Sequence, residues 1–336
     1  MIDYDNLVLL LQVPEIPNLR FRRYRGEIDL PSIVEVFNAC KSFDGLEQSI
    51  TVEDVKRYLY QLIPEEQTER ITICEIDGEM IAFSFIYWEV KASGDWVYNL
   101  SGYLIPEWRD KGIGKVMLRY CEEQLRGFAD RHPIDVPKYF QRVVPESQSD
   151  LSQLLIKEGY QIIRYHYSMV RPIQLPLPDA PMPQGLQVRS VDEKDYRNVW
   201  DANQEAFAEN WWHNSVNEMD YEYWKSSPWF NPHLWKVAWD GNQVAGMVLN
   251  YINANENLEY NRKRGYTEEI CVRKAWRKRG LARSLLAQSI HMFKEMGFEE
   301  TALGVDAGNE SGALRLYKSV GYEVAHRSLT YRKPLR

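Results

Sequence analysis

A short motif that could bind a phosphate occurs twice in this 336-residue chain. Residues 108–114 read WRDKGIG, and residues 276–282 read WRKRGLA. Apolar residues at helical spacing follow each copy, so each copy would form the start of a helix. Unpaired N–H groups and the positive dipole end attract anions to a helix N-terminus, where glycine lets the anion approach the backbone. The two motifs therefore predict binding sites for a pyrophosphate.

The repetition of this motif gives it weight. A single R-x-x-G-x-small match carries little information, because glycine makes up about 7% of residues and chance matches are common. Two copies, each between an apolar strand and a helix, are much harder to explain by chance. The structural alternative is a tight turn that needs glycine only for its backbone. Neither copy has the spacing of the G-x-x-x-x-G-K-[ST] or G-x-G-x-x-G nucleotide motifs.

The elements around the two motifs also occur twice. An Asp-Gly pair, at residues 77–78 and again at 240–241, separates two alternating apolar runs in each half, which predicts a β-hairpin. Beyond its motif, the second half predicts a strand at 300–307, a helix at 310–320 and a closing strand at 321–334. The chain is therefore interpreted as a degenerate duplication with mixed α and β elements.

A proline-rich segment marks the expected boundary between the two halves. Residues 172–183 read PIQLPLPDAPMP, which places five prolines in twelve residues. This composition favours extended polyproline geometry over a helix or a central strand. We therefore expect an N-terminal domain at residues 1–172, a linker at 173–184 and a C-terminal domain at 185–336.

Composition excludes several classes of partner. The formal net charge of -7 has the wrong sign for docking on a nucleic-acid backbone or an anionic membrane. The four cysteines form no C-x-x-C pair and the six histidines show no ligand spacing, so we expect no metal site. The N-terminus lacks the basic residues of a signal peptide and its apolar run is too short to span a bilayer, which predicts a cytoplasmic protein.

Both motifs resemble motif A of the GNAT superfamily of N-acetyltransferases, Q/R-x-x-G-x-G/A, whose loop binds the pyrophosphate of acetyl-coenzyme A. The resemblance covers most of both halves, from an opening strand with Arg22 or Arg189 to a closing strand after Gly159 or Gly321. The chain is identified as a tandem GNAT protein, similar to mycothiol synthase-like two-domain acetyltransferases. The resemblance implies an α/β fold of two tandem GNAT-like domains, each with a mixed, mostly antiparallel central sheet flanked by helices.

The second half also resembles motif B of the family, N-x-x-x-A-x-x-x-Y-x-x-x-G. The matching residues are Asn309, Ala313, Tyr317 and Gly321. In the family, the asparagine contacts the pantetheine arm and the tyrosine protonates the departing thiolate. Counting back from Gly159 in the first half gives Leu155 in place of the tyrosine. The resemblance thus implies that the first half has lost the acid.

Glu268 and Glu269 precede the second motif A, and the corresponding residues 98–104 carry no carboxylate. An amine of pKa about 10.4 lies about 3.5 units above neutral pH, so presenting it uncharged costs about 4 to 5 kcal/mol. A nearby carboxylate can accept that proton. Strand alternation would place the two glutamates on opposite faces, so that at most one points at the site. Either one is a candidate base.

We therefore expect the C-terminal domain to move an acetyl group from acetyl-coenzyme A to a primary amine by direct attack, with Tyr317 as acid and Glu268 or Glu269 as base. The N-terminal domain would keep an acyl-coenzyme A pocket without catalysis. The residues expected to contact the coenzyme are Ile270, Val272, Arg277, Lys278, Arg279, Gly280, Leu281, Ala282 and Asn309 in the C-terminal domain, and Arg109, Lys111, Gly112 and Gly114 in the N-terminal domain.

The acceptor is expected to be a small-molecule amine rather than a protein lysine, because a second domain and the aromatic-rich residues 209–239 could enclose a pocket. Packing between helices or domains is the alternative role of those aromatics. The rival function is a non-catalytic acyl-coenzyme A sensor or scaffold protein, in which the tyrosine and the glutamates are incidental.

Overall fold

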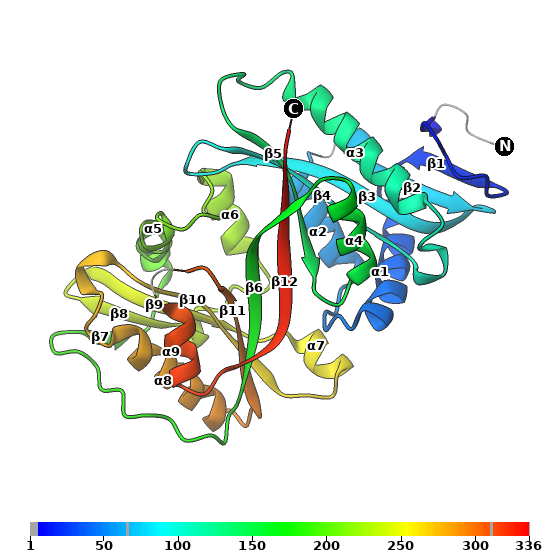
Figure 1. The fold of residues 1–336 in the computed structure, drawn as a ribbon. Coiled ribbons are helices and arrows are strands. Elements are labelled where there is room, and N and C mark those ends of the chain that lie inside the picture. Colours follow the sequence, from blue (N-terminus) through cyan, green and yellow to red (C-terminus); the bar gives the residue numbers. More distant parts are fainter. Residues whose placement is uncertain (1–5, 65–66, 310–311, 336) are drawn as a thin grey trace. The chain divides into compact units, whose positions relative to one another are not determined.

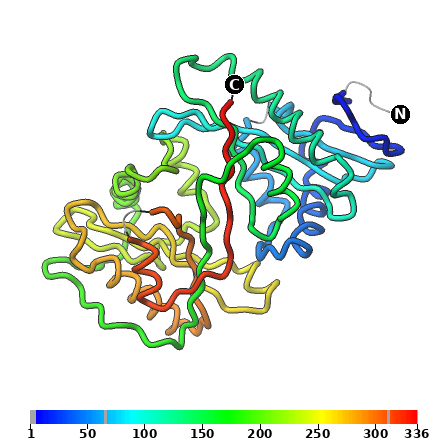
Figure 2. The backbone as a smooth tube through the Cα atoms, in the orientation of Figure 1, coloured from blue at the N-terminus to red at the C-terminus, as the bar shows by residue number. Residues whose placement is uncertain are grey.

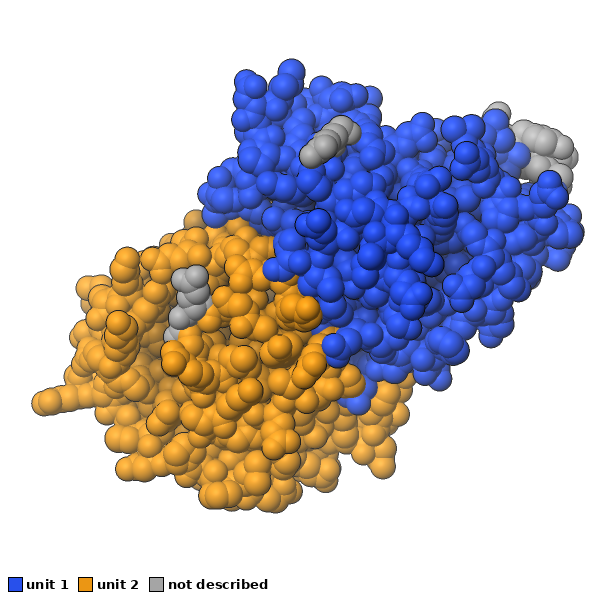
Figure 3. Space-filling view, viewed as in Figure 1, with its two compact units in different colours: residues 1–163, 328–336 blue, residues 164–327 orange. Residues whose placement is uncertain are grey.

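The computed structural model describes residues 6–64, 67–309 and 312–335. The chain forms two compact units: unit 1 comprises residues 1–163 and 328–336, and unit 2 comprises residues 164–327 (Figure 3). Each unit has a central sheet with helices on both faces (Figure 1). This architecture confirms the predicted α/β class with its mostly antiparallel sheets.

Unit 1 carries the helices α1 (Leu30–Asp44), α2 (Val52–Leu62), α3 (Ile113–Ala129) and α4 (Ser149–Lys157), and the strands β1 (Leu19–Arg23), β2 (Ile71–Ile76), β3 (Glu79–Val90), β4 (Trp96–Leu104) and β5 (Lys138–Pro145). Strands β1 to β4 pair antiparallel in chain order, and β5 runs parallel to β4. The last part of β12 (Glu323–Pro334) then pairs antiparallel with β5.

Unit 2 carries the helices α5 (Tyr196–Phe207), α6 (Glu218–Ser226), α7 (Ala254–Glu259), α8 (Leu281–Glu295) and α9 (Ala313–Ser319), and the strands β7 (Gln187–Arg189), β8 (Lys236–Asp240), β9 (Gln243–Tyr251), β10 (Arg264–Val272) and β11 (Glu300–Asp306). Strands β7 to β10 pair antiparallel, and β11 runs parallel to β10. The last part of β6 (Gln161–Pro172) pairs antiparallel with β11. The pairing of strands thus has the same pattern in both units.

The hairpins form where the Asp-Gly pairs predict them. Asp77 and Gly78 have φ of 53° and 87° between β2 and β3, which is the left-handed backbone of a two-residue hairpin turn. Gly241 has φ of 56° between β8 and β9. Both predicted antiparallel pairs are therefore confirmed.

Each sheet buries apolar side chains on both faces. In unit 1, α1 and α2 cover one face, and α3 and α4 cover the other. In unit 2, α5 packs on one face, and α8 and α9 pack on the other. The helix predicted at 310–320 is observed as α9, although Glu310 and Ser311 lie outside the described residues.

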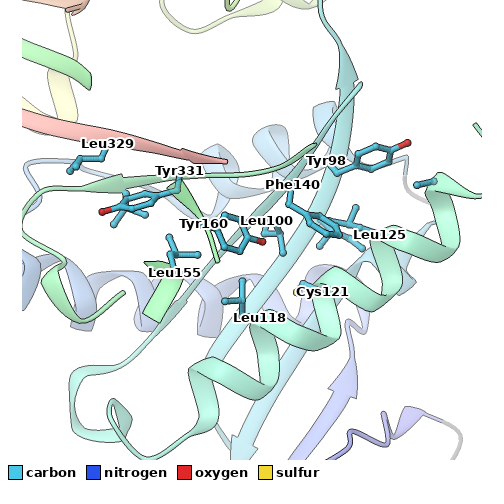
Figure 4. Packing of buried hydrophobic residues seen from close by; sticks show 13 residues of the cluster. Tyr98, Leu100, Leu118, Cys121, Leu125, Phe140, Leu155, Tyr160, Leu329 and Tyr331 are labelled. Atoms are coloured by element: carbon cyan, nitrogen blue, oxygen red, sulfur yellow. The ribbon is translucent and has the colours of Figure 1, made fainter. Parts of the chain in front are cut away.

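The unit boundaries differ from those expected from the proline-rich segment, because two strands cross between units. Residues 166–172 of β6 pair with β11, so they belong to unit 2. Residues 328–334 of β12 pair with β5, so they belong to unit 1. Leu329 and Tyr331 lie in the core of unit 1 close to Leu155 (Figure 4). Residues distant in sequence therefore complete each core.

The proline-rich segment does not separate the two units. Residues 173–186 form neither helix nor strand and lie inside unit 2, where they connect β6 to β7 (Figure 2). Among the described residues, no helix is long and apolar enough to cross a membrane.

Candidate active site

The two motif turns have the same backbone. Gly280 and Gly112 both have φ of 86° and precede α8 and α3, respectively. Two residues earlier, Lys278 and Asp110 have φ of 62° and 57°. The N-cap residue of each helix is this glycine, which has no side chain to cap the helix. Since glycine adopts this left-handed conformation without strain, the conformation explains the glycine at both positions and leaves the first helical N–H groups without a side-chain cap.

The motif arginines fasten these turns to the rest of each unit. Nε of Arg277 donates to the carbonyl of Val272 at 3.0 Å, and Nη1 donates to Glu209 at 2.9 Å. Arg109 likewise donates to the end of β4 and makes two hydrogen bonds, of 2.6 and 2.9 Å, to the buried carboxylate of Asp44. These contacts point to a positioning role for both guanidinium groups.

The other predicted coenzyme residues of unit 2 divide into two groups. Lys278, Arg279 and Gly280 are exposed at the turn, and Arg279 donates to the carbonyl of Gln184 at 2.9 Å. The remaining residues lie in the core beneath α8 or near the ends of the flanking elements. Leu281 is buried in the core under α8, Ile270 and Val272 pack against that core, Ala282 is half-buried in the first turn of α8, and the N–H of Asn309 donates to the carbonyl of Asp306.

In unit 1, the predicted residues lie around the corresponding turn. Nζ of Lys111 lies 4.4 Å from the centroid of the Trp108 ring. A Cβ on Gly114 would contact Leu154 of α4 at 3.6 Å, so α3 and α4 approach closely there. Gly112 and Gly114 both line a cavity, described below.

Strand β10 contains a bulge at the two candidate bases. Glu268 pairs with Leu249 and Cys271 pairs with Met247, so β10 has one extra residue at this point. Glu269 has φ of 48°, in the left-handed region. A bulge interrupts the two-residue alternation of a strand. The expectation that Glu268 and Glu269 face opposite sides is therefore wrong.

The neighbours of β10 show which face each glutamate takes. Before the bulge, the hydroxyl of Thr267 hydrogen-bonds to Tyr322 in the core beneath α8 and α9. Because side chains alternate along a strand, Glu268 points to the opposite face, which α5 covers. Beyond it, Glu269 accepts a hydrogen bond of 2.9 Å from Asn203 of α5. The extra residue thus brings two carboxylates to the same face.

Glu268 spans the diverging ends of two parallel strands. Pairing between β10 and β11 ends at Tyr266 and Ala302, and beyond that point Oε1 of Glu268 accepts a hydrogen bond of 2.9 Å from the N–H of Gly304. The surrounding protein and the charge of Glu269 raise the pKa of Glu268 to about 8, against the opposing effect of the Gly304 bond. Loss of hydration also raises the pKa of Glu269. Glu268 thus exchanges protons near neutral pH.

Tyr317 approaches from the other face of the sheet. Its ring is buried beneath α9 in the core, 6.3 Å from the Tyr322 ring. Burial, reinforced by the charge of Glu268, raises the pKa of the Tyr317 phenol above its usual value, so the group is protonated at neutral pH. No described residue hydrogen-bonds to its hydroxyl. A buried phenol therefore lies against one face of β11, and two carboxylates of β10 lie on the opposite face of the sheet.

The corresponding place in unit 1 has different groups. Strand β4 keeps continuous register with β3, without a bulge. Arg142 of β5 spans the diverging strands and donates to the carbonyls of Leu100 and Gly102 at 2.8 and 2.6 Å. Leu155, at the position expected for the acid, is buried and lines a cavity of about 460 Å³ that extends to the motif turn. A cation and an apolar side chain thus replace the carboxylates and the phenol.

Several of these residues carry no signal in the sequence. Asn203 and Gly304 lie far from Glu268 and Glu269 along the chain, and only the fold brings them together. Arg142 follows no motif. Within the described residues, no three His, Cys, Asp or Glu side chains gather in a way that could hold a metal ion.

Known proteins resemble this chain at several levels. The model of the "Acetyltransferase (GNAT) family" matches residues 31–134 and 198–322. Mycothiol acetyltransferase of Streptomyces bingchenggensis is 29% identical over 191 residues, which cover 55% of this chain and 59% of that protein. For the first relatives compared, the alignment thus spans a little over half of their length.

Two further relatives align over more of the chain. Mycothiol acetyltransferase of Thermobispora bispora is 25% identical over 286 residues, covering 76% of this chain and 96% of that protein. The crystal structure of a GCN5-related N-acetyltransferase from Sphaerobacter thermophilus superposes with a TM-score of 0.73 and 26% identity, covering 97% of this chain and 98% of that one. With a family match in each half, this chain belongs to the GNAT acetyltransferase family as a tandem member.

Proposed function

We propose that unit 2 transfers an acetyl group from acetyl-coenzyme A to a primary amine of a small molecule. The observation that supports this proposal is the bulge that brings Glu268 to the divergence of β10 and β11, with Tyr317 packed against β11 from the other face and the motif turn of α8 fastened to the end of β10 through Arg277. Acyl-coenzyme A is the donor that the family uses, and the acyl group is proposed to be acetyl.

The residues at the turn fit the diphosphate of the coenzyme. The turn at Gly280 is exposed, and this N-cap glycine has no side chain to cap α8, so the first N–H groups of the helix can bind an anion. Exposed Lys278 and Arg279 add positive charge. Arg277 would hold the turn in place through Val272 and Glu209. Asn309, next to the end of β11, would contact the pantetheine arm, as the resemblance to the family implies.

The chemistry would proceed by direct attack. The lone pair of the amine forms the new C–N bond at the thioester carbon, and the C–S bond breaks. Tyr317 gives its proton to the departing thiolate, and Glu268 accepts the proton that the amine loses. A backbone N–H near Val272 would stabilise the oxyanion, since preorganised donors are effective in such sites. Both side chains then exchange protons with solvent.

Glu268 suits the base role better than Glu269 does. A base is most effective when its pKa lies near the working pH, and that of Glu268 is about 8. Glu268 lies at the strand divergence beside Gly304, whereas Glu269 is held by Asn203 of α5. We therefore assign proton transfer to Glu268 and acceptor binding to Glu269.

The acceptor face is suited to a cationic small molecule. Tyr251 stacks on Tyr266 with ring centroids 4.7 Å apart, and Trp229 packs on Tyr251 at 5.3 Å. Aromatic rings beside carboxylates favour an amine that carries positive charge. Relatives described as mycothiol acetyltransferases support a small-molecule acceptor over a protein lysine.

Unit 1 would bind an acyl-coenzyme A without catalysis. Its motif turn matches that of unit 2, and the adjoining cavity of about 460 Å³ is of the size of a ligand pocket. Leu155 cannot donate a proton, and Arg142 places a positive charge where a base is needed.

A thiol-release assay tests this function. Acetyl-coenzyme A is incubated with a panel of amines that includes diamines, amino sugars, amino acid amides and a lysine peptide. The wild type should release coenzyme A with one class of small amine, and Tyr317→Phe should lower that rate by at least about tenfold, as for removal of a general acid.

Tyr322→Phe is the matched control. Its hydroxyl bonds Thr267 and Thr301 in the core, so its loss should lower stability and leave turnover within about twofold. Turnover that survives Tyr317→Phe would remove this tyrosine from catalysis. Absence of amine-dependent thiol release across the panel would instead favour the acyl-coenzyme A sensor.

A further inference from the structure

A histidine outside both motifs lies close to Glu268. His166 of β6 pairs with Asp306 of β11 across the antiparallel ladder. Nε2 of His166 is 3.0 Å from the place that a Cβ on Gly304 would occupy, and Oε1 of Glu268 is 3.7 Å from the same place. The imidazole and the carboxyl group therefore approach one point beside Gly304.

Strand alternation supports this orientation of His166. Its neighbour Tyr167 packs with the core under α8 and α9, and Met169 is fully buried there. Successive side chains of a strand point to opposite faces, so His166 takes the face that α5 covers. Glu268 and Glu269 lie on the same face. The glycine at 304 leaves room for the ring, since a methyl group there would press against Nε2.

The charged groups around His166 come from three strands. Asp306 of β11 faces it across the ladder, Glu268 of β10 lies beside it, and Arg164 of β6 lies two residues away. Asp306 is buried and held in place, because it accepts hydrogen bonds from Trp211 at 2.7 Å and from the N–H of Gly308 at 3.0 Å. Its carboxylate also lies 4.0 Å from Arg164.

These surroundings leave the imidazole neutral at pH 7. The protein around the ring lowers the pKa of His166, and the charge of Asp306 opposes that effect in part. The ring is nevertheless reachable from solvent. Below about pH 8, Glu268 mostly carries its proton, so the neutral imidazole is the more available acceptor there.

We propose that His166 is a second proton acceptor of this site and takes the proton of the acceptor amine when the amine attacks the thioester. The C–N bond forms, the C–S bond breaks, the amine proton moves to the imidazole and Tyr317 protonates the thiolate. The imidazolium faces Asp306 and then releases its proton to solvent. This inference rests on the proposed function and adds a residue that neither motif contains.

The test is the pH profile of kcat/KM for acetyl transfer to the most active amine of the panel. His166→Gln, Glu268→Gln and the double variant are compared with the wild type from pH 6 to pH 9.5. His166→Gln should lose about tenfold or more at pH 6.5 and recover to within about twofold above pH 9, where Glu268 is ionised. The double variant should be low at every pH.

His291→Gln is the control, since that histidine lies on the surface of α8 and pairs only with Glu295 among the described residues. A His166→Gln rate that is unchanged, or reduced by one constant factor at all pH values, would overturn the proposal. Tyr317→Phe at the same pH values tests the role of Tyr317 as acid separately from the role of His166 as proton acceptor. If Tyr317→Phe retains full turnover, the role of Tyr317 as acid fails whatever the histidine does, whereas a wild type that releases no thiol with any amine overturns the proposed function itself.

Discussion

The turn at Gly112 in unit 1 and the turn at Gly280 in unit 2 share their backbone angles, but the strands that lead into them differ. Strand β4 runs in continuous register with β3, whereas β10 has an extra residue between Glu268 and Cys271. The backbone of the turn therefore does not depend on the bulge. The two turns share the bond from the motif arginine to the preceding strand and the glycine conformation.

The diverging strands carry opposite charges in the two units. Arg142 donates to two carbonyls of β4 in unit 1, whereas Glu268 accepts from an N–H of β11 in unit 2. A fixed guanidinium repels an amine that arrives as a cation, and a carboxylate attracts it. Three changes thus distinguish the units: the bulge, the charge at the diverging strands, and leucine at position 155 in place of a tyrosine.

Removal of the last nine residues should have the largest effect. A chain that ends at Arg327 lacks the strand that pairs with β5, together with Leu329 and Tyr331 of the unit 1 core. We expect unit 1 to lose its cooperative unfolding transition and to be digested by protease. Thermal unfolding and limited proteolysis measure this.

Leu329→Ala is the graded control for that truncation, with an expected loss of about 2 to 5 kcal/mol. A truncated chain that melts like the full chain would show that β12 is dispensable for unit 1. For the same reason, a fragment of residues 1–172 is not a fair test of unit 1.

In the His166→Gln background, where the second acceptor is absent, Glu268→Gln should lower turnover by about 10² to 10⁴-fold above pH 8, the usual effect of removing a general base. Glu268 acts as a base only when ionised, so the wild-type contribution rises with pH through about 8 and the loss shrinks at lower pH. Glu269→Gln is the matched variant, since glutamine can still pair with Asn203. Equal losses in both variants would contradict the assignment of the base.

Glu268→Gln should also increase stability at high pH. The carboxyl is protonated in the fold up to about pH 8 but ionises near about pH 4.3 when unfolded. The folded chain therefore holds more protons between these values, and the stability of the wild type falls as pH rises. Glutamine lacks this dependence, so its Tm advantage should grow from pH 5 to 8. A constant Tm difference would mean that the group is hydrated in the fold.

Leu155→Tyr should have the smallest effect. Placed in a Tyr317→Phe background, the new phenol restores the acid to unit 1 but leaves Arg142 and the regular β4 unchanged. Thiol release should therefore change by less than about twofold, because acid and base act as a unit. Recovery of turnover would show that the tyrosine alone separates the two units.

The sequence predicts the parts of this site that depend on local structure. The two turns, the hairpins and the position of Tyr317 follow from spacing and glycine content within short segments. The bulge at Glu269 cannot be predicted in this way, because two adjacent glutamates in a strand do not indicate that the strand holds an extra residue. His166 lies in a segment that the proline-rich run assigned to the other domain.

The strand crossing is unpredictable for a related reason. Residues 161–172 follow the first half of the sequence but pair with β11 of unit 2, and residues 323–334 follow the second half but pair with β5 of unit 1. The fold of the whole chain sets these partners. Periodicity identifies a strand but carries no information on which sheet it joins.

The most direct test of the central claim compares Gly280→Val with Gly112→Val in one amine acetylation assay. Both replacements force a β-branched residue to φ of 86° in the same turn, at a cost of about 1 to 3 kcal/mol, and only at Gly112 does the new Cβ also press on Pro14. We predict that Gly280→Val lowers the initial rate by about 10²-fold or more and that Gly112→Val leaves it within about threefold, with both variants folded. A rate that falls with Gly112→Val and survives Gly280→Val would place the chemistry in unit 1 and contradict this account.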